Sequence, residues 1–137
     1  MREGLGIQAK ALRANGNAAA LSALAIRHNA KLAVVADVKA YAELKQCLSG
    51  TGIEAAAGAS GLEDAAARPA DCTIASIVGV AGLAPALTAV RQGRRVALAN
   101  KECLVSAGRL FMGEVKRHGT ELVTVDSEHS GVMQALE

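Results

Sequence analysis

The sequence has almost no aromatic residues: Tyr41 and Phe111 are the only two, and tryptophan is absent. A chain of 137 residues is about one domain long, and such a chain can bury a core without disulfides or metal ions. The core must therefore be built from alanine, valine, leucine and isoleucine, which suit helices packed closely on a parallel sheet. The scarcity of aromatic side chains also argues against a protein that binds nucleic acid by base stacking.

Cysteine is scarce as well. Cys47, Cys72 and Cys103 are the only three, and none belongs to a C-x-x-C pair, so we expect neither a disulfide scaffold nor a zinc site. The formal net charge is +2, without a long run of one sign. The chain does not open with a signal-peptide pattern, and no apolar run is long enough to span a bilayer. We expect a cytoplasmic protein whose partners are neither nucleic acid nor a membrane.

Short apolar runs alternate along the chain with longer alanine-rich or amphipathic segments. Strands are expected at 6–12, 31–36, 52–56, 72–78, 95–99 and 121–125, with 72–78 as a buried strand. Helices are expected at 18–28, 38–48, 62–67, from the turn that contains Pro85 to 92, and from 103 or 107 to 117. Asn17 and Asp37 are expected N-caps, and Gly119 is an expected helix end. The alternation predicts an α/β fold, a mostly parallel sheet with helices on both faces.

Ligands of such a fold bind where the carboxyl ends of the strands lead into helices. Three loops follow apolar strands: Gly79–Gly82, Asn100–Glu102 and Asp126–Ser130. We expect all three at the same end of the sheet. The first is glycine-rich, so its backbone can approach an anionic ligand at the start of the next helix, although an ordinary turn explains the glycines equally well.

The second loop places an amide, a cation and a carboxylate directly after a strand. Asn100 and Glu102 can hydrogen-bond sugar or amide groups, and Lys101 can pair with an anionic or carbonyl substrate. The alternative is a capped turn with Lys101 in solvent.

The third loop holds two carboxylates, Asp126 and Glu128, two residues apart. In extended chain they point the same way and repel each other unless a cation joins them, and oxygen ligands suit Mg²⁺ or Mn²⁺. The alternative, compatible with the first, is that Asp126 or Ser127 caps a helix whose first turn contains Glu128.

Four segments together resemble the 1-deoxy-D-xylulose 5-phosphate reductoisomerase family. They are 97–105 (ALANKECLV), 125–130 (VDSEHS), 77–83 (IVGVAGL) and 11–17 (ALRANGN), and their order and spacing agree with the family over nearly the whole chain.

The resemblance implies an enzyme that uses NADPH and Mn²⁺ or Mg²⁺. The family converts 1-deoxy-D-xylulose 5-phosphate to 2-C-methyl-D-erythritol 4-phosphate in non-mevalonate isoprenoid biosynthesis, and the full-length protein would form a homodimer. By position, the resemblance implies NADPH contacts for Asn15, Gly16, Asn17, Asn100 and Glu102. It implies substrate contacts for Lys101, the expected catalytic residue, and for Ser127, and metal binding by Asp126 and Glu128.

The sequence also departs from the family pattern. The resemblance implies a Rossmann-like fold that lacks the family's first strand and its G-x-T-G-x-I-G phosphate loop. The family's third metal carboxylate, its active-site flap and its C-terminal helical domain have no counterpart here. We expect residues 1–125 to form a truncated NADPH-binding domain and 126–137 to begin the catalytic domain. The chain alone is expected to be inactive. The alternatives are a non-catalytic nucleotide- or metal-binding remnant and, less in keeping with the motif spacing, another NAD(P)-dependent oxidoreductase.

Overall fold

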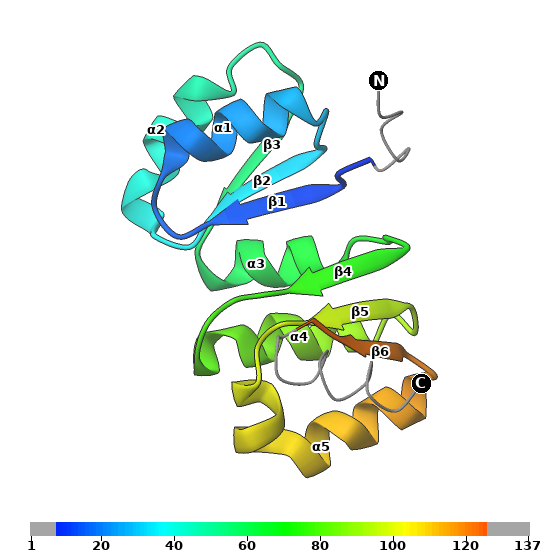
Figure 1. The fold of residues 1–137 in the computed structure, drawn as a ribbon. Coiled ribbons are helices and arrows are strands. Elements are labelled where there is room, and N and C mark those ends of the chain that lie inside the picture. Colours follow the sequence, from blue (N-terminus) through cyan, green and yellow to red (C-terminus); the bar gives the residue numbers. More distant parts are fainter. Residues whose placement is uncertain (1–7, 126–137) are drawn as a thin grey trace. The chain divides into compact units, whose positions relative to one another are not determined.

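The computed structural model describes residues 8–125. The chain divides into two compact units, Met1–Arg68 and Pro69–Glu137, and each contains one parallel three-stranded sheet (Figure 1). Within residues 8–125 no helix combines the length and the apolar character needed to cross a membrane.

The first unit is a succession of strands and crossover helices. Its elements are β1 (Ala11–Ala14), α1 (Ala18–Arg27), β2 (Leu32–Val35), the short 3₁₀ helix η1 (Val38–Ala40), α2 (Tyr41–Cys47), β3 (Glu54–Ala57) and α3 (Gly58–Ala67). The strand order is β1-β2-β3, with all pairs parallel. Because consecutive parallel strands need a crossover, each strand end leads into a helix at the same end of the sheet.

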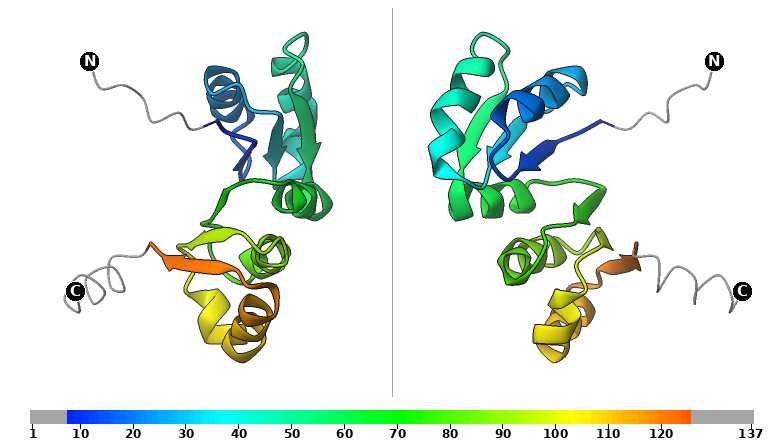
Figure 2. Two further views of the ribbon diagram at one scale, coloured as in Figure 1. Left: turned by 90° about the vertical axis from the view of Figure 1, so that its right-hand side faces the viewer. Right: turned by 60° about the vertical axis from the view of Figure 1, so that its left-hand side comes forward.

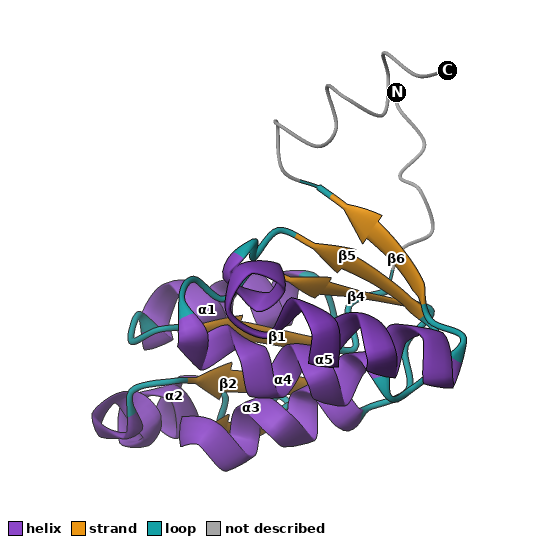
Figure 3. Cartoon of the chain, turned by 90° about the horizontal axis from the view of Figure 1, so that it is seen from below, coloured by secondary structure: helices purple, strands orange, loops and turns teal. Residues whose placement is uncertain are grey.

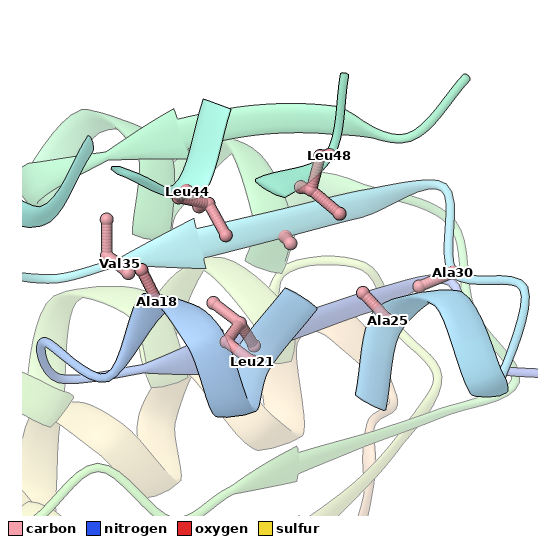
Figure 4. Close-up of a cluster of buried hydrophobic side chains, with 8 residues drawn as sticks. Ala18, Leu21, Ala25, Ala30, Val35, Leu44 and Leu48 are labelled. Atoms are coloured by element: carbon pink, nitrogen blue, oxygen red, sulfur yellow. The ribbon is translucent and has the colours of Figure 1, made fainter. Parts of the chain in front are cut away.

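Strand β2 is buried along its whole length, which requires a layer on each face of the sheet. Ala33 and Val35 lie in a core with residues of α1 and α2, and Figure 4 shows this cluster between the two helices and the strand. On the other face α3 packs on β2, where Gly61 lies so close to Val34 that a Cβ atom would come within 3.1 Å of its Cγ1. The core consists of alanine, leucine and valine, as the composition predicts.

The second unit repeats the pattern. Its elements are β4 (Cys72–Ala75), η2 (Val80–Gly82), α4 (Leu83–Val90), β5 (Arg95–Leu98), α5 (Glu102–His118) and β6 (Glu121–Thr124). The order is β4-β5-β6, again parallel, and Figure 3 shows these three strands running in one direction. Helix α4 packs on β4, β5 and α5, and the further views in Figure 2 show α4 and α5 beside each other.

The two faces of this second sheet differ in burial. Val96 and Leu98 of β5 are buried, as is Phe111 of α5. Alternate residues of a strand face opposite sides, and the other side carries the cross-strand row Ile74, Ala97 and Val123. Ile74 is 71% exposed, and Val123 is 38% exposed.

An ion-pair cluster joins α4 to α5. The Nε of Arg91, at the end of α4, donates a hydrogen bond of 2.8 Å to the carboxylate of Glu114 on α5. Arg117 and His118 lie near the same carboxylate, at 3.6 and 3.7 Å. The hydrogen bond from Arg91 is the main cause that lowers the pKa of Glu114 below its usual value.

The expected fold class is confirmed: the protein is α/β and Rossmann-like, with parallel strands and helices on both sides. Asn17 and Asp37 cap helices with their side chains, and Gly119 ends α5 in the left-handed conformation, all as predicted. The last helix was expected to start at 103 or at 107. Helix α5 begins at Glu102 and is kinked at Ala107, whose φ of −140° is not helical, so the structure has a helix start or a break near each of these positions.

Three expectations need correction. The first strand, expected at 6–12, runs from Ala11 to Ala14 in the described part of the chain. The strands form two three-stranded sheets, where the alternation pattern suggested a single sheet. The segment 72–78 was expected to be a buried strand, but β4 ends at Ala75, and both Cys72 and Ile74 are exposed. Cys72 and Ile74 lie on the exposed side of this sheet, the side of Val123, so an apolar sequence alone did not ensure a covering layer. The boundary expected at 125/126 lies at the limit of the described residues and stays a prediction.

Candidate functional site

In the first unit, the candidate cofactor residues Asn15, Gly16 and Asn17 connect the carboxyl end of β1 to α1. All three are exposed. The carbonyl oxygen of Asn15 accepts a hydrogen bond of 2.8 Å from the backbone N–H of Asp37, which follows β2. This bond continues the pairing of the two strands and holds the two loops side by side.

The side chain of Asn17 caps α1. Its Oδ1 accepts a hydrogen bond of 2.9 Å from the backbone N–H of Ala20, so one of the first amides of the helix is satisfied by the protein itself. The amino-terminal end of α1 carries the partial positive charge of the helix dipole. The exposed segment 15–17 therefore offers an anion the backbone and the amide groups at the start of a helix.

Asp37 is a residue of this site that the sequence analysis treated only as a helix cap. Its Oδ1 accepts a hydrogen bond of 2.9 Å from the backbone N–H of Lys39, which confirms the cap. The same side chain also borders Gly16, since a Cβ atom at position 16 would lie 3.7 Å from the Cβ of Asp37. The carboxylate of Asp37 thus lies at the edge of the exposed 15–17 turn. Its position directly after a buried strand was the signal available in the sequence.

In the second unit, the loop after β4 and the loop after β5 meet at the carboxyl end of the sheet. The amide nitrogen of Asn100 donates hydrogen bonds to two carbonyl oxygens of the β4–η2 loop, those of Ile77 at 2.5 Å and Gly79 at 3.0 Å. Its Oδ1 accepts a hydrogen bond of 3.0 Å from the backbone N–H of Glu102. Asn100 is only 3% exposed. The expected meeting of these two loops is confirmed by the bonds.

Gly82, the last residue of the glycine-rich loop named from the sequence, completes this contact. A Cβ atom at position 82 would come closer than 3.0 Å to both the carbonyl oxygen of Ile77 and the amide nitrogen of Asn100. Only glycine fits between them. Gly82 is buried and ends η2, just before α4 begins.

Lys101 and Glu102 begin α5. Lys101 is exposed, and its carbonyl oxygen accepts hydrogen bonds of 3.0 Å from the backbone N–H groups of Leu104 and Val105. Glu102 is half-buried in the first turn. Cys103 comes next and is 1% exposed, so burial raises the pKa of its thiol. The thiol is therefore protonated at neutral pH, which makes Cys103 a buried core residue and not an activated nucleophile.

The third candidate loop, which contains Asp126, Ser127 and Glu128, lies outside the described residues. Val125 is the last residue described, and its N–H donates a hydrogen bond of 3.1 Å to the carbonyl oxygen of Leu98. Pairing with β5 therefore continues up to the residue before the candidate metal ligands. Within residues 8–125 no cluster of three or more His, Cys, Asp or Glu side chains could hold a metal ion.

Two hollows of the described surface lie elsewhere. They measure about 330 and 320 Å³ and share Tyr41 of α2 together with residues of β3. Neither is lined by Asn15, Gly16 or Asn17. The candidate site is thus identified by its loops and hydrogen bonds and not by a concave pocket.

Comparison with known proteins relates this chain to one family. The sequence profile of 1-deoxy-D-xylulose 5-phosphate reductoisomerase matches residues 3–108. The reductoisomerase of Rhodospirillum centenum is 56% identical over 127 residues, which are 93% of this chain and 32% of that protein. The enzyme of Zymomonas mobilis is 53% identical over 129 residues, 94% of this chain and 33% of that protein. The chain thus spans about a third of the length of the curated relatives it matches.

Solved structures agree with this assignment. The Zymomonas mobilis reductoisomerase in complex with NADPH superposes with a TM-score of 0.90 at 53% identity, covering 93% of this chain and 34% of that one. A reductoisomerase in complex with NADPH, fosmidomycin and magnesium superposes with a TM-score of 0.81 at 36% identity, covering 87% of this chain and 30% of that one. The chain therefore belongs to the 1-deoxy-D-xylulose 5-phosphate reductoisomerase family.

Proposed function

We propose that this chain supplies the NADPH-binding part of a 1-deoxy-D-xylulose 5-phosphate reductoisomerase. The enzyme would convert 1-deoxy-D-xylulose 5-phosphate to 2-C-methyl-D-erythritol 4-phosphate with a divalent metal, in non-mevalonate isoprenoid biosynthesis. One observation carries the proposal: nearly the whole described fold superposes on a relative solved with NADPH, at 53% identity. The loops after β1, β4 and β5 present polar or glycine residues at the carboxyl ends of the strands, where such folds bind nucleotides.

The cofactor contacts are proposed for Asn15, Gly16 and Asn17 after β1 and for Asn100 and Glu102 after β5. The exposed turn at 15–17 and the start of α1 suit a phosphate group or a sugar hydroxyl, because they combine helix-end N–H groups with uncrowded backbone. Glu102 is half-buried at the start of α5 and can accept a hydrogen bond from an amide or a hydroxyl. When bound, NADPH supplies the hydride, and these residues hold and orient it.

Lys101 and Ser127 are proposed as substrate contacts, and Asp126 and Glu128 as metal ligands. The exposed ammonium group of Lys101 suits an anionic or carbonyl oxygen of a phosphosugar. The donor set of Asp126 and Glu128 consists of hard oxygens, which fit Mg²⁺ or Mn²⁺. Two carboxylates leave most of the coordination shell to water or substrate, so this chain alone should bind the metal weakly.

The remaining proposals concern the cellular setting. All three cysteines are free, and Cys47 and Cys72 are exposed, which agrees with a reducing cytoplasm. We place the protein there, and for the full-length protein we propose the homodimer implied by the family resemblance.

The proposal is tested by titrating the chain with NADPH, and in parallel with NADH, while recording its ¹H–¹⁵N spectrum. Shifts centred on 15–17 and 101–102, larger for NADPH than for NADH at equal concentration, are expected. Glu102→Gln should weaken binding, because a carboxylate accepts stronger hydrogen bonds than an amide does. Glu63→Gln is the matched control, since Glu63 is an exposed residue of α3. An absence of shifts, or equal shifts spread over the whole surface, would contradict the proposed cofactor site.

An activity assay distinguishes a chain that only binds NADPH from a chain that also catalyses the reaction. With 1-deoxy-D-xylulose 5-phosphate, NADPH and Mn²⁺, we expect no NADPH oxidation above background by the 137-residue chain. NADPH binding without turnover is the result expected for a cofactor-binding part. Turnover that is lost in Lys101→Ala would refute the expected inactivity of the chain while supporting the family activity.

A further inference from the structure

Asn100 uses every polar group of its side chain within the protein. The side-chain amide nitrogen donates hydrogen bonds to the carbonyl oxygens of Ile77 and Gly79, and the side-chain oxygen accepts one from the backbone N–H of Glu102. A side-chain amide has two N–H donors and one carbonyl acceptor, so its donors and at least one lone pair of its oxygen are already engaged. At 3% exposure, little of the residue is left for contact with a ligand.

The three bonds join segments that are far apart in sequence. Ile77 and Gly79 belong to the loop after β4, which leads through η2 into α4, and Glu102 is the first residue of α5. Asn100 itself follows β5. A single side chain therefore fixes two loops at the carboxyl end of the sheet, together with the first turn of α5, where Lys101 and Glu102 stand.

Gly82 closes the same contact from the opposite side. A side chain there would displace the amide of Asn100 or the carbonyl of Ile77. Gly79, the acceptor next along the chain, has a φ of +76°, which glycine adopts without strain. The backbone conformation at Gly79 and the close packing at Gly82 therefore favour glycine in the protein itself, whether or not a ligand binds.

We propose that Asn100 is a positioning residue, which clasps the 77–82 loop to the start of α5 and acts on NADPH through the placement of that loop, Lys101 and Glu102. The inference rests on the proposed cofactor site, but it changes the role of Asn100 from a side-chain ligand to the clasp that orders the site. Here "the clasp" means Asn100 with Ile77, Gly79, Gly82 and Glu102.

The wild-type chain provides the first test, which needs no variant. The two Nδ2 protons of Asn100 should exchange with solvent much more slowly than those of the exposed Asn15, because both are held in buried hydrogen bonds. NADPH should leave the chemical shifts of these protons nearly unchanged while it shifts the backbone amides of Lys101 and Glu102. Fast exchange, or an Nδ2 shift that is the largest in the titration, would overturn the proposal.

Two variants test the coupling from both sides of the clasp. Asn100→Asp replaces the donors with a carboxylate that faces two carbonyl oxygens, and Gly82→Ala leaves Asn100 intact but pushes against it. Both should change the ligand-free amide shifts of residues 77–82 and 102–104. Both should also raise the dissociation constant for NADPH about tenfold or more, which is the effect expected from the loss of a buried hydrogen bond. Gly113→Ala is the control, because a Cβ there meets no atom within 4 Å, and it should do neither.

The outcomes separate this proposal from the proposed function. If Asn100→Asp weakens NADPH binding but leaves the ligand-free loop shifts as in wild type, Asn100 is a direct ligand and the clasp is refuted. The clasp is also refuted if the Gly82→Ala variant binds NADPH with the affinity of the wild type. If the wild type does not bind NADPH, the proposed function fails, and the clasp is then decided by the ligand-free spectra: shared shifts in both variants support it, and unchanged shifts overturn it.

Discussion

Replacing Leu44 with alanine should cost the first unit a large part of its stability. Leu44 of α2 is fully buried in the cluster shown in Figure 4. Leucine-to-alanine changes in cores cost about 2–5 kcal/mol, and the cost rises with the cavity that remains. Ala18, Ala25, Ala30 and Ala33 belong to this cluster. An alanine side chain has no rotamer with which to fill a gap, so we expect about 3–4 kcal/mol, above the lower end of the range.

This loss is large for a unit of this size. At roughly 0.05–0.15 kcal/mol per residue, the 68 residues of the first unit have a free energy of unfolding of about 3–10 kcal/mol. The midpoint of thermal unfolding should fall by about 12–30 °C. Urea unfolding followed by the amide signals of Ala33 and Val35 measures the change directly, because both amides lie on the central strand of the sheet.

Two controls make the experiment decisive. Leu44→Met conserves volume and should cost less than about 1.5 kcal/mol. Leu24→Ala makes the same chemical change on α1, where the side chain is 47% exposed, and should cost less than about 1 kcal/mol. A cost below about 1.5 kcal/mol for Leu44→Ala, or equal costs at the two leucines, would refute the reasoning that an alanine-rich core cannot close a cavity.

Four further substitutions have expected outcomes that follow from single structural features. Asn17→Ala removes the cap on α1, so urea unfolding of the first unit should show a loss of about 1 kcal/mol; an unchanged midpoint would disprove the cap's contribution. Glu114 has a lowered pKa because of Arg91, so its contribution is present above about pH 4.3 and is lost as the pH falls through the lower folded value. Glu114→Gln should therefore flatten the acid side of the stability profile, and a profile identical to wild type would contradict this. Gly113→Ala should raise the melting temperature, because alanine is more favourable than glycine in a helix by about 0.5–1 kcal/mol. Gly119→Ala should lower the melting temperature, because φ is +64° at this position. Calorimetry in which both substitutions shift the melting temperature in the same direction would contradict this account.

Local features of the fold were accessible from the sequence. The alternation of apolar runs with alanine-rich segments predicted parallel strands and crossover helices, because each run is the length of a strand and each segment the length of a helix. Asn17, Asp37 and Gly119 were recognisable as caps, since capping depends on the residue type and its position at a helix end.

Long-range features were not accessible in the same way. The apolar run 72–78 has the composition of a buried strand, but whether a strand is covered depends on which elements pack on each face of its sheet, and Cys72 and Ile74 lie on the exposed face. The division of the strands into two sheets is likewise a matter of partners and not of local sequence.

The candidate site shows the same division between local and long-range information. The motifs indicated which loops matter, and the bonds of Asn100 confirm that two of them meet. The burial of Asn100 and the tight fit of Gly82 were not predictable, because a polar residue and a glycine in a loop have the composition of an exposed turn. Both depend on atoms contributed by a segment about twenty residues away in the chain.

The position of β4 has a consequence for handling the protein. Among the described residues β4 pairs with β5 alone, so the N–H and C=O groups along its other side have no strand partner. The other outer strands, β1, β3 and β6, carry charged residues (Arg13, Glu54 and Glu121), but β4 (CTIA) carries none, and its Ile74 is exposed. Charged side chains on such strands discourage pairing between molecules. Self-association of concentrated samples should therefore begin at β4, and Ile74→Lys should reduce their light scattering.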